Sequence, residues 1–187
     1  MRLFLAIDLD EALRDSLFTA AEPMRAAEPT SAWVAAPKLH LTLEFLGEAE
    51  EARVQPLMRA LDAVAAPQRP FEMRLHDIGA FPNFRRARVV WCGVESEPRL
   101  ELLHHDLELA AQECGFELEG RAFRPHVTLA RVRRPIGEER GRALHRVART
   151  VEFRGLQHVA HITLYESLLE PAGARYRRLH AATFDGR

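Results

Sequence analysis

The chain has 187 residues, of which 47% are hydrophobic and 28% charged, so it can bury an ordinary core and is not disordered by composition. A formal net charge of −1 excludes a molecule that binds nucleic acid through overall positive charge. No apolar run approaches the ~20 residues that a membrane-spanning helix needs. Asp8 and Asp10 interrupt the apolar start, which argues against a signal peptide. We therefore expect a cytoplasmic protein with no membrane contact.

The spacing of apolar residues predicts strands and helices along the whole chain. Short apolar runs and period-2 alternation indicate strands, and stripes at helical spacing indicate helices. In chain order these are a strand at 2–9, a helix at 11–27 that Pro23 kinks or ends, a strand at 39–47, a helix at 48–66, strands at 71–79 and 87–95, a helix at 97–116, a strand at 125–132, a helix at 136–150, strands at 151–159 and 160–169, and a closing segment at 174–184. The order strand–helix–strand–strand thus occurs twice.

The pattern His-x-Thr-Leu occurs three times, at 40–43, 126–129 and 161–164. The first two copies lie on the strand that precedes the helix of each repeat, offset by 126 − 40 = 86 residues. The third copy lies in the last strand of its repeat, where the first repeat has "VVWCGV". We therefore take His40 and His126 as paired candidates, and His161 as a strand residue outside the pair.

Such a pair has the groups that phosphodiester chemistry uses. Residues i and i+2 of a strand face the same side, so each copy presents an imidazole beside a hydroxyl. With a pKa of ~6.5, one imidazole can act as a base and its partner as an acid near neutral pH. The two threonines could hold non-bridging oxygens. A metal site is the alternative for paired histidines, but the chain lacks the usual Cys, His-Glu-x-x-His or carboxylate pattern.

The charge around the second copy is strongly positive. Residues 121–134, "RAFRPHVTLARVRR", contain Arg121, Arg124, Arg131, Arg133 and Arg134 and no acidic residue. This local field suits an anionic ligand, although a solvated strand end would have the same composition. Phe84 with its neighbouring arginines could likewise follow an RNA backbone or be a solvated hairpin.

Several segments together resemble the two-histidine (2H) phosphoesterases. They are "WVAAPKLHLTLEFLGE" (33–48), "FPNFRRARVVWCGV" (81–94), "FRPHVTLAR" (123–131) and "ESLLEPAGARYRRL" (166–179), and they are most similar to the LigT-like RNA 2′,3′-cyclic phosphodiesterases, historically called 2′-5′ RNA ligases. The resemblance implies an α+β fold in which residues 1–187 form one bilobal domain. Each lobe would have an antiparallel sheet flanked by helices, and the active-site cleft would lie between the lobes.

The resemblance also implies roles for individual residues. His40 would protonate the O3′ leaving group and His126 would activate water, with no metal or other cofactor. Thr42, Thr128 and Arg131 would bind the phosphate, and Phe45 would stack on a base. Strict alternation, however, places Phe45 and Arg131 on the face opposite the histidines, so either a bulge intervenes or the strands end before them.

The leading interpretation is a monomeric, metal-independent hydrolase of RNA 2′,3′-cyclic phosphate ends that yields 2′-phosphomonoesters. Alternatives are a phosphodiesterase for small cyclic phosphates, including small cyclic nucleotides, 2′-5′ RNA ligation in reverse, and a non-catalytic nucleotide-binding module. Cys92 and Cys114 are expected to be buried free thiols, with one disulfide as the alternative. Three aromatic residues are assigned to packing and two adjacent histidines to a solvated helix face: Trp33, Trp91, Tyr176, His104 and His105.

Overall fold

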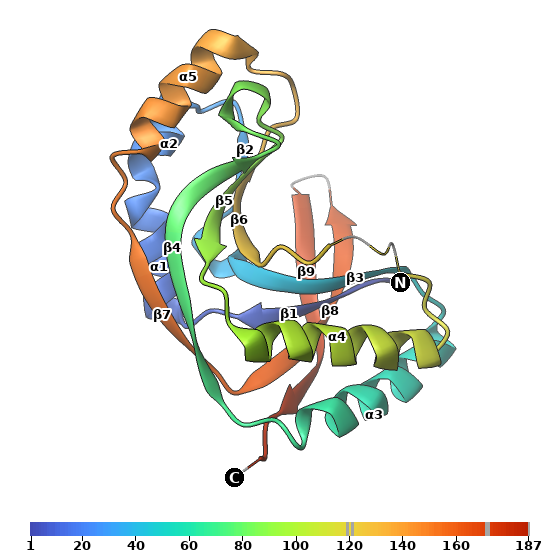
Figure 1. The fold of residues 1–187 in the computed structure, drawn as a ribbon. Coiled ribbons are helices and arrows are strands. Elements are labelled where there is room, and N and C mark those ends of the chain that lie inside the picture. Colours follow the sequence, from blue (N-terminus) through green and yellow to red (C-terminus); the bar gives the residue numbers. More distant parts are fainter. Residues whose placement is uncertain (119, 121, 171–172, 187) are drawn as a thin grey trace.

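The computed structural model describes residues 1–118, 120, 122–170 and 173–186, and within them nine strands and five α-helices (Figure 1). The strands are β1 (Arg2–Asp8), β2 (Ala32–Trp33), β3 (His40–Glu48), β4 (Phe71–Phe81), β5 (Val89–Val94), β6 (His126–Arg131), β7 (Arg154–Val159), β8 (His161–Glu170) and β9 (Gly173–Thr183). The helices are α1 (Glu11–Ala20), α2 (Glu22–Ala27), α3 (Val54–Ala65), α4 (Pro98–Glu113) and α5 (Gly137–Ala148). Short 3₁₀ turns lie at η1 (Ala36–Lys38), η2 (Glu51–Arg53) and η3 (Phe84–Arg86).

All nine strands join one curled antiparallel sheet whose middle is the contact between β3 and β6 (Figure 1). Reading outwards from that contact, one half is β3, β1, β8 and β9, and the other half is β6, β5, β4 and β7. The short β2 also pairs with β6. Within the described residues a single register pair, Leu41 with Val127, links the two halves. The expected pair of antiparallel sheets is thus present as two halves, one of four strands and one of five including β2, that are continuous through β3 and β6.

The helices cover the two halves separately. Helices α3 and α4 pack on each other and on β3, β8 and β9. Helix α1 packs on β7, and α5 packs on α2 and η3 (Figure 1). The stripe predicted for the helix at 48–66 is largely buried, with Val54, Leu57 and Leu61 in the hydrophobic core. The α+β fold expected from the sequence is therefore confirmed.

The structural repeat begins one strand earlier than the sequence pattern predicted. By their place in the sheet, β1 and β5 are equivalent, because each lies beside one of the two central strands. In the same way β8 is equivalent to β4, whereas the sequence pattern matched β4 with β7 and β5 with β8. Apolar spacing identifies a strand but does not show which half of the sheet the strand enters. The equivalence of β3 and β6, on which the paired histidines depend, holds.

The structure also tests the predictions made for the first helix, the two cysteines and membrane-spanning helices. The helix predicted at 11–27 ends at Ala20, and α2 starts with Pro23 in its first turn. Cys92 is buried, Cys114 is half-buried and both are free thiols, which excludes the disulfide. In the described part of the chain, no helix has the length and apolar character needed to cross a membrane.

Candidate active site

The first two His-x-Thr copies lie side by side at the middle of the sheet. Leu41 and Val127 are register partners, and both are fully buried. Because β3 and β6 are antiparallel, this register sets each motif histidine opposite the threonine of the other copy. Residues opposite each other in this way have Cβ atoms roughly 4.5–5.5 Å apart. The two imidazoles and two hydroxyls are half-buried and share the face opposite Leu41 and Val127.

The backbone fixes both imidazole rings in the same tautomer. Nδ1 of His40 lies 2.7 Å from the carbonyl of Lys38, and Nδ1 of His126 lies 2.6 Å from the carbonyl of Arg124. A carbonyl oxygen only accepts hydrogen bonds, so Nδ1 carries the proton in both rings. Nε2 is left for chemistry, and in His40 it lies 3.2 Å from Oγ1 of Thr42. Each ring therefore presents one titrating nitrogen.

Burial lowers the pKa of both imidazoles below 6.5, and the positive charge of Arg131 lowers both further. The hydrogen bond to the backbone carbonyl raises each pKa but does not cancel these effects. The negative charge of Asp8 raises the pKa of His40. At neutral pH each Nε2 thus has a lone pair that can accept a proton, as a general base requires.

Each motif ends in a β-bulge that changes the side to which the following residues point. The register of β3 against β1 slips by one residue at Leu43, and that of β6 against β5 slips at Leu129. This extra residue turns Phe45 and Arg131 to the face of the histidines. The ring of Phe45 is 55% exposed. The structure thus brings both to the paired motifs, and they are separated by the same offset, 131 − 45 = 86 residues.

Aromatic side chains flank the two imidazoles. The ring of Phe4 lies 5.2 Å from His40, and Tyr176 meets the same imidazole edge-on at 5.3 Å. Phe81 meets His126 edge-on at 5.1 Å. Tyr176 does pack, as expected, but it packs on His40. Phe4 and Phe81 had no distinguishing sequence signal, because each stands in an ordinary strand pattern.

The third His-x-Thr copy lies outside the pair. His161 is on β8, which is separated from β3 by β1. Its Nε2 lies 3.5 Å from a carboxylate oxygen of Asp8, and the buried Thr163 donates a hydrogen bond of 2.9 Å to that oxygen. This copy therefore surrounds a carboxylate, whereas the other two copies share an open face.

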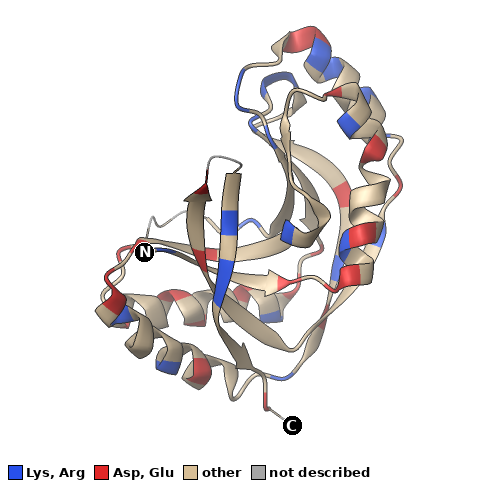
Figure 2. Cartoon of the chain, turned by 180° about the vertical axis from the view of Figure 1, so that it is seen from behind, with Lys and Arg blue, Asp and Glu red and all other residues tan. Residues whose placement is uncertain are grey.

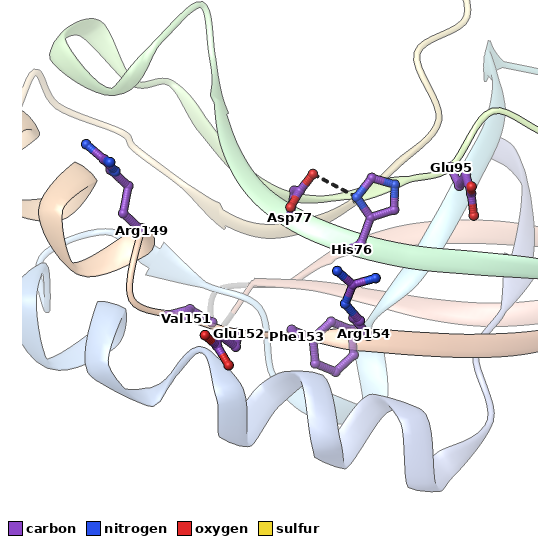
Figure 3. Close-up of a pocket in the computed structure, with 8 residues that line it drawn as sticks. All are labelled: His76, Asp77, Glu95, Arg149, Val151, Glu152, Phe153 and Arg154. Carbon is purple, nitrogen blue, oxygen red and sulfur yellow. Dashed lines mark hydrogen bonds and ion pairs between the residues drawn. The ribbon is translucent and has the colours of Figure 1, made fainter.

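Two cavities differ in the residues that line them. A cavity of about 190 Å³ lies against His40 and is lined by Asp8, Tyr165 and Tyr176 among others. A cavity of about 840 Å³ lies elsewhere, between β4 and the segment that leads into β7, and contains neither motif histidine (Figure 3). Its lining side chains carry mixed charge: His76, Asp77, Glu95, Arg149, Glu152 and Arg154. The smaller cavity therefore belongs to the candidate site and the larger one does not.

The expected positive surface forms an edge next to the site, which we call the basic edge. Val89 pairs with Arg131, so the loop around η3 lies beside the end of β6. Figure 2 shows basic positions gathered on these two loops. The side chains of the basic edge are exposed and are Arg85, Arg86, Arg88, Arg131, Arg133 and Arg134. Arg121, part of the same run in the sequence, lies outside the described residues. Phe84 stacks on His145 at 4.7 Å, which gives this ring a packing role.

The prediction of a solvated His104 was wrong. The residue is 7% exposed, stacks on Phe123 at 4.0 Å and lies on the apolar stripe of α4. Its Nε2 faces Glu44 at 3.2 Å and its Nδ1 faces Glu108 at 3.6 Å. Ligating atoms of these three residues lie within 4.8 Å of one another. Because the carboxylates contact different ring nitrogens, the arrangement suits a polar bridge between β3 and α4 better than a metal centre. His105 is exposed, as expected.

The sequence and the fold are similar to those of known proteins over nearly the whole chain. The profile of the family described as LigT like phosphoesterase matches residues 7–91 and 93–176. An RNA 2′,3′-cyclic phosphodiesterase of Methanothermobacter thermautotrophicus is 34% identical over 94% of this chain and 95% of the relative. A protein of the same name from Archaeoglobus fulgidus is 32% identical over 96% of this chain and 98% of the relative.

Solved structures give the same result. The crystal structure of TT0787 from Thermus thermophilus has a TM-score of 0.81 and 30% identity, covering 100% of this chain and 99% of that one. The structure of E. coli LigT complexed with 3′-AMP has a TM-score of 0.76 and 30% identity, covering 98% of this chain and 97% of that one. The likeness therefore extends through both halves of the sheet.

Proposed function

Because the chain belongs to the LigT like phosphoesterase family, we propose that it hydrolyses the 2′,3′-cyclic phosphate at the end of an RNA to a 2′-phosphomonoester. The observation that carries the proposal is the paired arrangement of His40 and His126. Each imidazole is held through Nδ1 by a backbone carbonyl, so its Nε2 is the nitrogen available for proton transfer on a shared face. One such nitrogen can accept a proton while the other donates one.

In the proposed step, His126 Nε2 takes a proton from water while the water oxygen attacks phosphorus. The bond between phosphorus and O3′ breaks in line, and His40 Nε2 gives its proton to O3′. Over one turnover His126 gains one proton and His40 loses one, so the total charge of the two histidines does not change. The choice of His40 as the acid and His126 as the base rests on the resemblance to the family.

We assign two threonines and an arginine to binding of the phosphate, and a phenylalanine to binding of an RNA base. The hydroxyls of Thr42 and Thr128 donate hydrogen bonds to the non-bridging oxygens, and Arg131 offsets the charge that develops on them. These groups account for the charge without a metal ion. Phe45 offers an exposed ring for a base, where stacking contributes about 1–3 kcal/mol.

The basic edge supports RNA as the substrate over a small cyclic nucleotide, because it extends beyond the groups that one phosphate would contact. We also propose that the protein acts as a monomer, since one chain carries both histidines. A cytoplasmic location agrees with its two free thiols, which persist in reducing compartments.

The test replaces each histidine in turn and measures cleavage of a short RNA with a 2′,3′-cyclic phosphate end in EDTA. His40→Ala and His126→Ala are each expected to lose about 10²–10⁴-fold in rate, which is the usual contribution of a general acid or base. His161→Ala is expected to stay within about tenfold of wild type.

His105→Ala, on the exposed side of α4, is the matched control and is expected to leave the rate unchanged. Circular dichroism verifies that all variants are folded. Near wild-type rates in either His40→Ala or His126→Ala would contradict the proposed pair.

A further inference from the structure

The last residue of β1, Asp8, lies between two histidines in the sheet. Asp8 is the register partner of His40 on β3, and both line the same cavity. On its other side β1 pairs with β8, which carries the third His-x-Thr copy. The Asp8 side chain is 19% exposed, so most of the carboxylate is shielded from water. A carboxylate in this position acts on His40 through a poorly screened environment.

Strand β8, which carries the third copy, supplies three of the four side chains that hold this carboxylate. Thr163 donates to Oδ2 at 2.9 Å and Tyr165 donates to Oδ1 at 2.7 Å. Nε2 of His161 lies 3.5 Å from Oδ2, and Nη2 of Arg178 lies 3.4 Å from it. Burial alone would raise the pKa of Asp8, but the bonds from His161, Tyr165 and Thr163 and the charge of Arg178 lower it to about 2. Asp8 is therefore ionised throughout the neutral range.

The charges around His40 otherwise oppose its protonation. The titratable or charged groups that line its cavity besides Asp8 are Arg14, Lys38, Tyr165, Arg175 and Tyr176. Arg131 acts on His40 from β6. Among the described residues that line this cavity, Asp8 is the one carboxylate. It is thus the group there that can stabilise an imidazolium at His40.

We propose that Asp8, held in place by the third His-x-Thr copy, is a positioning residue that favours the protonated form of His40 and so makes it the acid of the pair. This inference rests on the proposed function and adds to it. Burial, a backbone carbonyl and Arg131 act on both motif histidines, whereas Asp8 acts on His40. The third copy then has a role, because it helps to hold the carboxylate that favours protonation of His40 over protonation of His126.

The test is Asp8→Asn, which keeps the size of the side chain and removes its charge. The basic limb of the pH profile of kcat/KM reports loss of the acid's proton, and it is expected to move to lower pH. For each unit of that movement, kcat/KM above the limb falls about tenfold. An NMR titration of the His40 Cε1 proton, assigned with His40→Ala, is expected to move in the same direction while that of His126 stays in place.

Arg178→Gln provides a second variant with the opposite sign. Arg178 is 59% exposed, so its replacement is tolerated by the fold, and it leaves Asp8 with less compensating charge. The His40 titration and the basic limb are expected to move to higher pH. Asp62→Asn is the matched control, because it removes the same charge and an Asp–His contact of 2.6 Å between α3 and β9, away from the cavity. It is expected to leave both readouts unchanged.

A uniform loss of activity in Asp8→Asn, with the limb and the His40 titration unmoved, would show a purely structural role and overturn the inference. Unchanged behaviour of both Asp8→Asn and Arg178→Gln would overturn it as well. The titration needs no substrate, so it still decides the effect of Asp8 on His40 if the wild-type protein leaves the RNA uncleaved. That last result would instead refute the proposed function.

Discussion

His40 and His126 owe their similarity to the backbone and their difference to one carboxylate. In both, Nδ1 contacts the carbonyl two residues earlier, which leaves Nε2 on the shared face. This contact depends on the path of the chain before each strand, which periodicity does not describe. Asp8 was visible in the sequence as a charge at the end of an apolar run, yet its neighbours come from β3 and β8. The sequence predicts the pair, and the sheet order reveals what distinguishes its members.

Arg131 is expected to set the pH range of the reaction. Its charge lowers the pKa of both motif histidines, so Arg131→Gln raises both values. Both limbs of the bell-shaped profile of kcat/KM are then expected to move to higher pH. The maximum is expected to fall by about 10²-fold, because a charged donor to the phosphate is lost. Profiles of wild type and variant, measured on the same cyclic-phosphate RNA, check this.

The control for this prediction is Arg2→Gln, which removes the same charge from the exposed start of β1. It is expected to keep both limbs in place. Limbs that stay fixed in Arg131→Gln would mean that the arginine does not face the imidazoles as the bulge at Leu129 indicates.

At the level of elements, the sequence predicted the helices and seven of the nine strands of the described residues, but it missed the short β2 and gave no type to the segment that forms β9. Strong apolar spacing made this possible, as in α3 and β8. The sheet order and the match between repeats were beyond it, because pairing partners depend on contacts between distant segments. The bulges at Leu43 and Leu129 could be predicted only in part. Strict alternation placed Phe45 and Arg131 on the wrong face, and that conflict was itself the signal of a bulge.

The contact between β3 and β6 is expected to be important for stability. Leu41 is fully buried, with 0% of its surface accessible, and its register partner is Val127. Leu41→Ala is expected to lower the free energy of unfolding by about 2–5 kcal/mol, the usual effect of truncating a buried leucine. Urea unfolding followed by circular dichroism measures this.

Leu102→Ala is the control for that measurement, since Leu102 is 64% exposed on α4. Its expected effect is within about 0.5 kcal/mol. A loss of the same small size in Leu41→Ala would show that the two halves of the sheet do not depend on this contact.

At the level of the whole molecule, charge is distributed unevenly despite a formal net value of −1. Figure 2 shows acidic and basic positions mixed along the helices, while the basic edge collects arginines beside the paired motifs. The basic edge lies at the end of β6, and the paired motifs lie on β6 and its neighbour β3. In the proposed function, an RNA end meets the imidazoles while its backbone lies along the arginines.

The basic edge is expected to govern substrate affinity and its dependence on salt. Replacing Arg133 and Arg134 together by alanine removes up to two phosphate contacts, so KM rises and the slope of log KM against log salt falls by about 1.4. The value of kcat is expected to change little, because neither side chain contacts the reacting atoms. Steady-state kinetics across a salt series test this expectation.

The matched control replaces Arg59 and Arg69, which are exposed outside the basic edge. That double variant carries the same change in net charge and is expected to keep the wild-type slope. Equal slopes in the two double variants would show that RNA follows another path over the molecule.

The product of one metal-free turnover shows whether His40 and His126 act as the acid and the base in the hydrolysis. A short RNA with a 2′,3′-cyclic phosphate end is incubated with the protein in EDTA and ¹⁸O-labelled water, and the product is examined by phosphorus NMR and mass spectrometry. We predict a 2′-phosphomonoester that contains one labelled oxygen, as attack by water with departure of O3′ requires. A 3′-phosphomonoester, or RNA that keeps its cyclic end, would contradict the roles assigned to His40 and His126.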